Sequence, residues 1–184
     1  MWYNENINKP VSTTKVSLEI GSKIFYPSHG AGWVKDKKEI EFGGKVQAYV
    51  EFEFINTPLS VSTPLSKIDE LGIRQVYTKS QIATKLKYLK ENEVKTPESM
   101  DFNALANILK DLETAGEIDS YIEIIQYCNY IRIERGKDGR LLPGSIDRSQ
   151  RSAVEHIACE LAVSTDTTLE EAQESIIKQL KIKL

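Results

Sequence analysis

Hydrophobic residues follow two different periods along the chain, and the change falls near residue 78. In residues 46–54 apolar and polar side chains alternate, which places on one face Val46, Ala48, Val50, Phe52 and Phe54. A period of two is typical of a strand that buries one of its faces. After Tyr77 the apolar residues recur every three or four positions, which is the period of an amphipathic helix. The pattern therefore predicts a β-rich part followed by a helical part.

Short strands account for the β-rich part. Pro27 ends the first apolar run because proline has no amide hydrogen to donate, and Gly43-Gly44 fits a two-residue hairpin loop. We expect strands at residues 24–26, 32–38, 46–54, 59–63 and 73–77, a stray strand near 15–20 and one helical turn within 65–72. About five short strands without a long helix favour a small SH3- or Tudor-like five-stranded β-barrel over residues 21–77.

Five helices are predicted after the barrel. Ser80 and Asp101 are candidate N-caps, and Gly116 is a candidate C-cap. The expected helices span residues 81–92, 102–114, 117–134, 145–163 and 169–181. Because the loops between them are short, we expect a compact all-α domain. The predicted fold class is α+β, with a flexible N-terminal arm over residues 1–20, the barrel over 21–77 and the helical domain over 78–184.

Composition and charge narrow the classes of function. The 184 residues are 40% apolar and 28% charged, as in ordinary globular proteins, and no stretch approaches the ~20 continuous apolar residues of a membrane helix. The net charge of -3 excludes a strongly basic, nonspecific nucleic-acid coat, so any nucleic-acid contact needs a local basic patch. Cys128 and Cys159 fit two buried thiols in a reducing cytoplasm.

Candidate catalytic chemistry is sparse. His29 and His156 fall in different predicted domains, and we predict no metal site at either. The sequence holds no phosphate-binding glycine loop and no nucleophile elbow. We therefore predict a protein that is not an enzyme, has no metal, cofactor or small-molecule substrate, and acts by binding; we expect a monomer.

Two windows of the chain are locally basic. The first runs from Arg74 to Lys95, is rich in lysine and is interpreted as a solvated helix face. The second runs from Arg132 to Arg151 and is rich in arginine, which binds phosphates through paired hydrogen bonds and can enter a minor groove. It spans two helix ends and their loop, so its cations could converge on one surface. The candidate DNA-binding residues are Arg132, Arg135, Lys137, Arg140, Arg148 and Arg151.

The stretch Gly21-Ser-Lys-Ile-Phe-Tyr-Pro-Ser-His-Gly-Ala-Gly-Trp-Val34 resembles the opening signature of the CarD/CdnL family of bacterial transcription regulators. That family shares its barrel with the polymerase-binding module of the transcription-repair coupling factor. The similarity continues through Tyr49–Phe54, Leu59–Pro64 and Gly72–Arg74, and more weakly over the helical part at Leu109–Gly116 and Arg148–Leu161.

The resemblance implies a two-part adaptor in the bacterial cytoplasm, associated with the nucleoid. The barrel would bind the β subunit of RNA polymerase, by pairing at an edge strand and through Lys38, Ile40, Val50, Phe52, Leu59, Val61 and Ser62. The helical domain would contact double-stranded promoter DNA at the upstream edge of the transcription bubble and stabilise the open complex.

Two departures from the family pattern affect single residues. Family members often carry a tryptophan that wedges into the minor groove beside the bubble, whereas this chain has Ser99-Met100-Asp101-Phe102 in that region. Met100 or Phe102 could act as an apolar wedge in its place, or Phe102 could be a core residue. In the barrel, Ser62 and Ile40 stand where the family has arginines, so the polymerase contact would depend more on backbone pairing.

Two other functions remain open at this point. One is a DNA-binding protein that acts without polymerase through the arginine-rich window. The other is an adaptor for RNA or the ribosome, because a glycine-rich barrel turn also resembles KOW modules.

Overall fold

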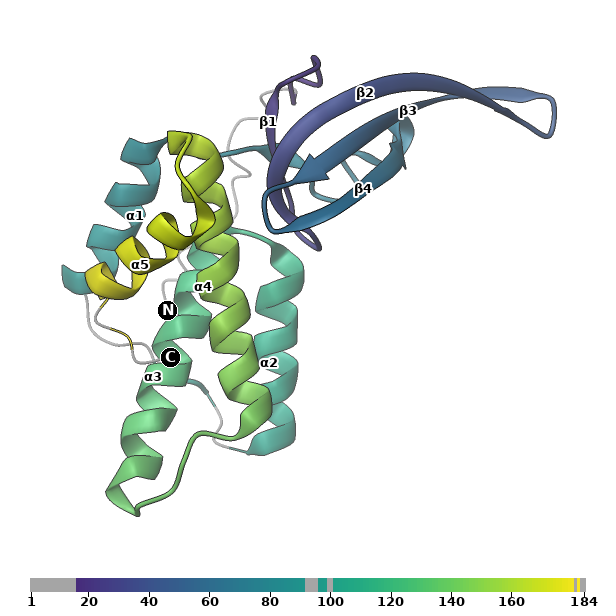
Figure 1. Cartoon of the computed structure of the whole chain (residues 1–184). Coiled ribbons are helices and arrows are strands. Elements are labelled where there is room, and N and C mark those ends of the chain that lie inside the picture. Colours follow the sequence, from purple (N-terminus) through teal and green to yellow (C-terminus); the bar gives the residue numbers. More distant parts are fainter. Residues whose placement is uncertain (1–15, 92–95, 99–100, 181, 183–184) are drawn as a thin grey trace, which may run out of the picture.

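The computed structural model describes residues 16–91, 96–98, 101–180 and 182, and within them a bent β-sheet stands on one end of a helical bundle (Figure 1). The predicted arm lies largely outside the described residues, as does Met100. The observed α+β architecture confirms the predicted fold class.

The sheet has five antiparallel strands in the order β4-β3-β2-β1-β5. Its strands are β1 (Lys23–Tyr26), β2 (Gly30–Phe42), β3 (Lys45–Phe54), β4 (Thr57–Pro64) and β5 (Arg74–Gln75), with a short 3-10 helix, η1 (Leu65–Lys67), between the last two. The sheet curls around a core of its own, made of Ile24, Tyr26, Val34, Val50, Phe52, Phe54, Ile68 and Ile73. The last strand is shorter than predicted, because only Arg74 and Gln75 pair with β1.

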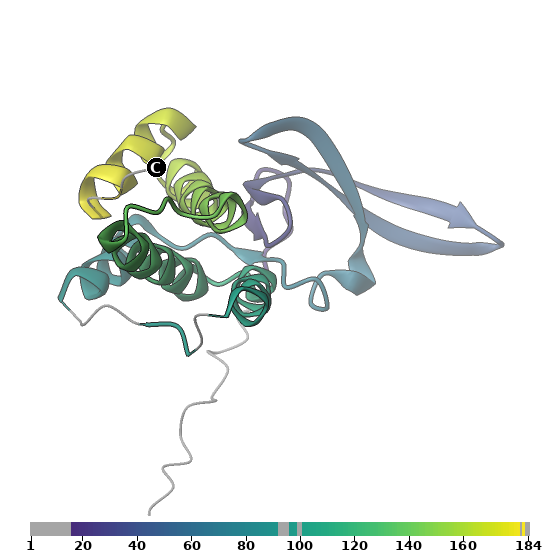
Figure 2. The same cartoon turned by 90° about the horizontal axis from the view of Figure 1, so that it is seen from below.

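The β2–β3 hairpin projects beyond the rest of the sheet (Figures 1 and 2). Gly43 and Gly44 form its two-residue loop, and their positive φ angles of 59° and 73° are those that this turn requires. Partner strands cover only part of its length: β4 pairs with β3 no further than Tyr49, and β1 pairs with β2 no further than Trp33. Val46 and Ala48 are therefore exposed, although their alternation predicted a buried face.

In the described part of the chain five helices follow the sheet: α1 (Lys79–Glu91), α2 (Phe102–Ala115), α3 (Ile118–Lys137), α4 (Gly144–Thr165) and α5 (Leu169–Leu180). Asp101 caps α2 as predicted, because its side chain accepts hydrogen bonds from the backbone N–H groups of Asn103 and Ala104. Gly116 ends that helix with φ of 66°. The prediction of Ser80 as an N-cap is wrong. The helix begins at Lys79, two residues before its predicted start, and Thr78 and Gln81 bond each other's backbone N–H groups there.

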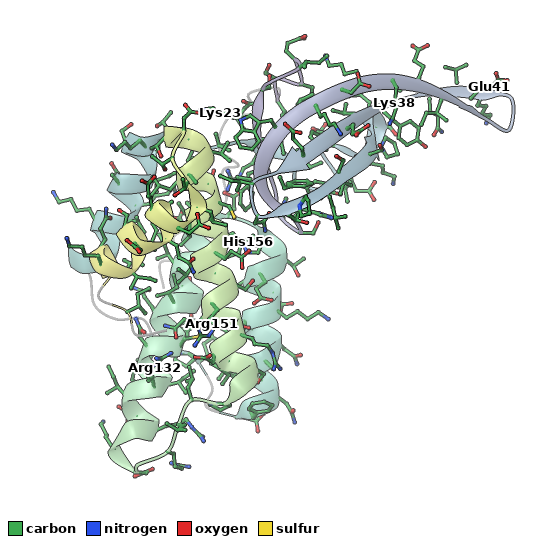
Figure 3. All side chains as sticks on the ribbon, viewed as in Figure 1. Lys23, Lys38, Glu41, Arg132, Arg151 and His156 are labelled. Carbon is green, nitrogen blue, oxygen red and sulfur yellow. The ribbon has the colours of Figure 1, made fainter. Side chains whose placement is uncertain are left out.

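One hydrophobic core fills the helical part and reaches into the sheet. Its buried residues come from all five helices, but Phe25 of β1 and Ala31 of β2 belong to it as well. Phe25 packs edge-on against Tyr121, at 6.1 Å between ring centroids, and Tyr121 stacks on His156, at 4.9 Å. His156 lies where α4 meets the sheet (Figure 3). The barrel and the bundle therefore share buried surface rather than meeting only at the connecting chain.

Candidate functional site

Metal ligands and reactive thiols were the first candidates for a site. Among them, no three His, Cys, Asp or Glu side chains lie close enough to hold a metal ion, and no helix is both long and apolar enough to cross a membrane. Both cysteines are free and buried, and burial raises the pKa of the Cys128 and Cys159 thiols to about 12. A thiol held protonated in this way is a poor nucleophile.

Strand β4 is a free edge of the sheet. It pairs with β3 on one side, and no described strand pairs with its other side. In an antiparallel ladder successive residues point their backbone groups in opposite directions. Because the β2–β3 hairpin closes at Phe42 and Lys45, the odd-numbered residues of β3 bond to β2 and the even-numbered ones to β4. Val61 and Thr63, opposite Phe52 and Val50, therefore bond to β3.

The same alternation leaves Ser60 and Ser62 with outward-directed N–H and C=O groups. Pro58 and Pro64 flank this part of β4 and have no N–H to offer, so they limit the length over which another strand could pair. Leu59 is 68% exposed beside it. The edge thus presents a short row of backbone donors and acceptors with one large apolar side chain at its start.

The predicted polymerase-binding residues separate into two groups in the structure. Leu59 and Ser62 are exposed on β4, Val61 is half-buried there, and Ile40 is 37% exposed on the projecting hairpin. Lys38 is half-buried and donates a 2.7 Å hydrogen bond to Glu51. Val50 and Phe52 are 2% and 0% exposed, so both side chains belong to the core, and Phe52 is fully covered.

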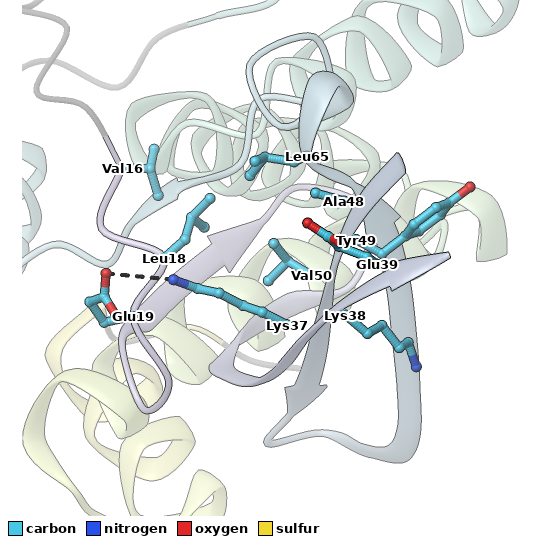
Figure 4. Close-up of a pocket in the computed structure, with 10 residues that line it drawn as sticks. All are labelled: Val16, Leu18, Glu19, Lys37, Lys38, Glu39, Ala48, Tyr49, Val50 and Leu65. Atoms are coloured by element: carbon cyan, nitrogen blue, oxygen red, sulfur yellow. Dashed lines mark ion pairs between the residues drawn. The ribbon is translucent and has the colours of Figure 1, made fainter. Parts of the chain in front are cut away.

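A hollow of about 510 Å³ lies beside the hairpin, next to the end of β4 (Figure 4). Apolar side chains line it, namely Val16, Leu18, Ala48, Val50 and Leu65. Charged residues stand at its rim, and Lys37 pairs there with Glu19 at 3.5 Å. The sequence did not reveal this hollow, because Val16 and Leu18 come from the predicted arm and Leu65 from the turn after β4.

The arginine-rich window forms the end of the bundle that lies away from the sheet. Arg132, Arg135 and Lys137 occupy the last turns of α3, Arg140 lies in the following loop, and Arg148 and Arg151 lie on α4. Arg132 and Arg151 approach each other across the two helices (Figure 3) because both contact Asp147, at 3.3 and 2.7 Å. Arg132 also donates to the buried amide oxygen of Gln150. It is therefore partly a structural residue.

Acidic neighbours reduce the free charge of this window. Glu134 binds Lys137, Asp138 binds Arg140, and Asp147 is shared by two arginines. Arg135 instead donates its Nε–H to the carbonyl of Leu141, at 2.8 Å. Arg148 is exposed and forms no ion pair with any described residue. Six cations against three carboxylates leave a local excess of three positive charges.

Phe102 lies at the same end of the bundle. It is 50% exposed at the start of α2, so it is not the core residue that one interpretation predicted. It lines a hollow of about 320 Å³ together with Arg135 and Arg140, over a floor that includes Leu105 and Ile131. The fold thus places a candidate wedge beside two candidate phosphate ligands. Leu141 and Ile133, which the sequence did not single out, are 87% and 61% exposed in the same loop and helix.

Arg74 does not belong to a solvated face, as the interpretation of the first basic window required. Its guanidinium lies between the sheet and the bundle and binds the carboxylate of Glu160, which is 1% exposed. A lone arginine in a two-residue strand carries no sequence signal for this role. Its partner is 86 residues away along the chain.

Comparison with known proteins identifies the sheet. Residues 18–77 match the family model of the CarD-like/TRCF RID domain. The matched residues include all of β1 to β5 and end two residues before α1 begins. No curated protein matches the chain.

Proposed function

We propose that this chain, whose residues 18–77 belong to the CarD-like/TRCF RID domain family, binds the β subunit of RNA polymerase and acts on promoter DNA. RID denotes an RNA polymerase-interacting domain. The observation that carries the proposal is the free edge of β4 within the family-matched sheet.

Strand addition is the binding mode that this edge favours. A polymerase strand placed beside β4 would find the outward backbone groups of Ser60 and Ser62, while Leu59 would supply apolar contact. The hollow of about 510 Å³ next to the end of β4 could take an apolar side chain of the same partner, with Lys37 and Lys38 at its rim. The short length of the edge suits a specific partner better than open-ended aggregation.

Promoter DNA is the second ligand in this proposal. Three excess positive charges at the end of the bundle favour a phosphate backbone. Phe102 would enter the minor groove from the hollow that it shares with Arg135 and Arg140. Among the described residues Arg135 bonds only through its Nε–H and Arg148 has no ion pair, so both can turn toward a phosphate.

The mechanism is a shift of population and needs no bond chemistry. A protein that binds the open promoter complex more tightly than the closed one favours melting by the ratio of the two affinities. The barrel would keep the protein bound to the polymerase, and the bundle would supply the preference for melted DNA at the upstream edge of the bubble. In this proposal the protein is a cytoplasmic, nucleoid-associated monomer.

A capture experiment tests the partner. The tagged chain is used to purify its partners from a bacterial lysate, with and without nuclease. Recovery of polymerase that survives nuclease supports the proposal. Polymerase that disappears with nuclease indicates a DNA-binding protein that acts without direct polymerase contact, and recovery of RNA or ribosomes in its place indicates an RNA adaptor.

Arg135→Ala, Arg140→Ala and Arg148→Ala combined are expected to weaken promoter DNA binding. Each lost phosphate contact lowers the slope of log affinity against log salt by about 0.9, so the triple variant should bind with a visibly flatter salt dependence. Filter binding at several salt concentrations measures both quantities. We leave Arg132 intact because it bonds to the buried Gln150.

The matched control removes three exposed lysines elsewhere, Lys79, Lys110 and Lys178. This variant has the same change in net charge, but it should keep the affinity and the slope of the wild type. An equal loss in both variants would assign the effect to overall charge and remove the arginine-rich window from the proposal.

A further inference from the structure

A buried ion pair joins the sheet to the bundle. Arg74 of β5 donates from both terminal nitrogens to Glu160 of α4, at 2.5 and 3.1 Å, and Glu160 also accepts the backbone N–H of Tyr77 at 2.6 Å. Two parallel bonds between a planar guanidinium and a carboxylate fix the angle between them as well as the distance. The pair therefore constrains how β5 is oriented toward α4.

Two aromatic rings flank the guanidinium. It lies 4.4 Å from the ring centre of Phe25 and 4.3 Å from that of Tyr77. Burial opposes the charge of Arg74, but hydrogen bonding and attraction from Glu160 outweigh it and raise the pKa of the guanidinium. The side chain thus stays charged inside a closed site, where an ion pair is screened little by salt.

Close backbone approach supports the same orientation. A Cβ atom on Gly116 would lie 2.5 Å from the ring of Pro27, so the end of α2 fits against the β1–β2 turn only because this residue is glycine. On the other side, Asn56 donates to Glu155 at 3.2 Å, and Lys23 binds Asp166 at 2.7 Å. Other interdomain contacts therefore surround the Arg74–Glu160 pair. Among the described residues, Glu160 is the one carboxylate that is buried.

We propose that Arg74 and Glu160 are positioning residues that fix the angle between the barrel and the helical domain. The β4 edge and the Phe102 end of the bundle are then parts of one rigid body, and a polymerase bound at one sets where the other meets the DNA. This positioning of DNA relative to the polymerase rests on the proposed function. The fixed angle between the two domains does not depend on it.

The test replaces the pair by apolar residues of similar size, as Arg74→Met with Glu160→Leu. Such replacements often leave stability unchanged, because they remove two buried charges together. Residual dipolar couplings of the full-length protein then report the orientation of each domain. We expect one alignment tensor for both domains in the wild type and two different tensors in the double variant, with an unfolding midpoint somewhat below that of the wild type because the Tyr77 N–H loses its acceptor.

Lys23→Met is the control, because it removes an exposed interdomain ion pair whose expected contribution is small. It should keep one shared tensor. If the double variant keeps one tensor as well, the pair does not set the angle and the inference is wrong. Should the double variant unfold, Glu160→Gln keeps the shape of the side chain and is measured in the same way.

A second measurement links the angle to function. In the double variant the affinity for the polymerase β subunit should stay within twofold of the wild type, whereas the lifetime of the open complex should fall by about tenfold. An unchanged lifetime despite two tensors would overturn the functional consequence alone. Absence of polymerase binding by the wild type would instead contradict the proposed function, and the tensors would still decide on the angle.

Discussion

Gly32→Ala is expected to prevent the barrel from folding. Gly32 pairs with Ile24 on one side and with Phe54 on the other, and an added Cβ would lie 1.9 Å from the carbonyl oxygen of Glu53. It would also lie within 3 Å of the Glu53 carbonyl carbon and of the Phe54 Cα. These are backbone atoms inside the sheet and cannot move aside as the end of a side chain would.

The loss of stability should exceed about 4 kcal/mol, beyond the range of most single substitutions. Denaturant unfolding followed by the fluorescence of Trp33, the next residue in β2, measures it. Gly136→Ala is the matched control: nothing lies within 4 Å of its added Cβ, and alanine favours a helix over glycine by up to ~1 kcal/mol. An unfolding midpoint for Gly32→Ala as high as that of the control would contradict this account of the glycine.

This glycine shows what could be predicted from sequence. The run from Gly21 to Val34 indicated a break between two short strands, and the structure confirms a strand on each side of a turn. The family resemblance rested on the same run and is confirmed by the match over residues 18–77. Local signals were sufficient here because turn formation depends on glycine and proline at fixed positions.

Contacts between distant segments could not be predicted in this way. The alternation from Val46 to Phe54 was correct for a strand, but it gave no sign that β4 stops pairing at Tyr49 and leaves the first half of the alternation in solvent. Period two describes the direction of side chains, and burial depends on which other strands cover them. Val50 and Phe52, which the resemblance placed among the polymerase contacts, lie on the covered part of this face and are buried.

The sequence likewise did not show which charged side chains are paired. Counting cations found the arginine-rich window, and the structure brings its members to one end of the bundle with Phe102. The count did not show that Asp147 is shared by Arg132 and Arg151, or that Arg74 is enclosed with Glu160. An arginine that binds a buried carboxylate and an arginine that faces solvent look alike in a sequence, because the difference lies in the partner.

Ser62→Pro is expected to weaken binding to the polymerase β subunit strongly while the barrel stays folded. Ser62 points its N–H away from β3, so proline at this position removes no bond of the β3–β4 ladder. It does remove an outward donor, and its ring occupies the space that a partner strand needs. One lost hydrogen bond is worth ~0.5–1.5 kcal/mol, and the steric conflict adds to it, so we expect the affinity to fall by about tenfold or more.

Calorimetric titration of the purified β subunit measures this loss, and circular dichroism verifies the fold of the variant. Ser62→Ala keeps the backbone donor and should bind like the wild type, which separates the backbone of β4 from the serine hydroxyl. Thr63→Pro places the same ring on the β3 side, where Thr63 faces Val50, and should destabilise the barrel itself. Wild-type affinity for Ser62→Pro would mean that the polymerase binds elsewhere, and the hollow beside the hairpin would then be the next surface to test.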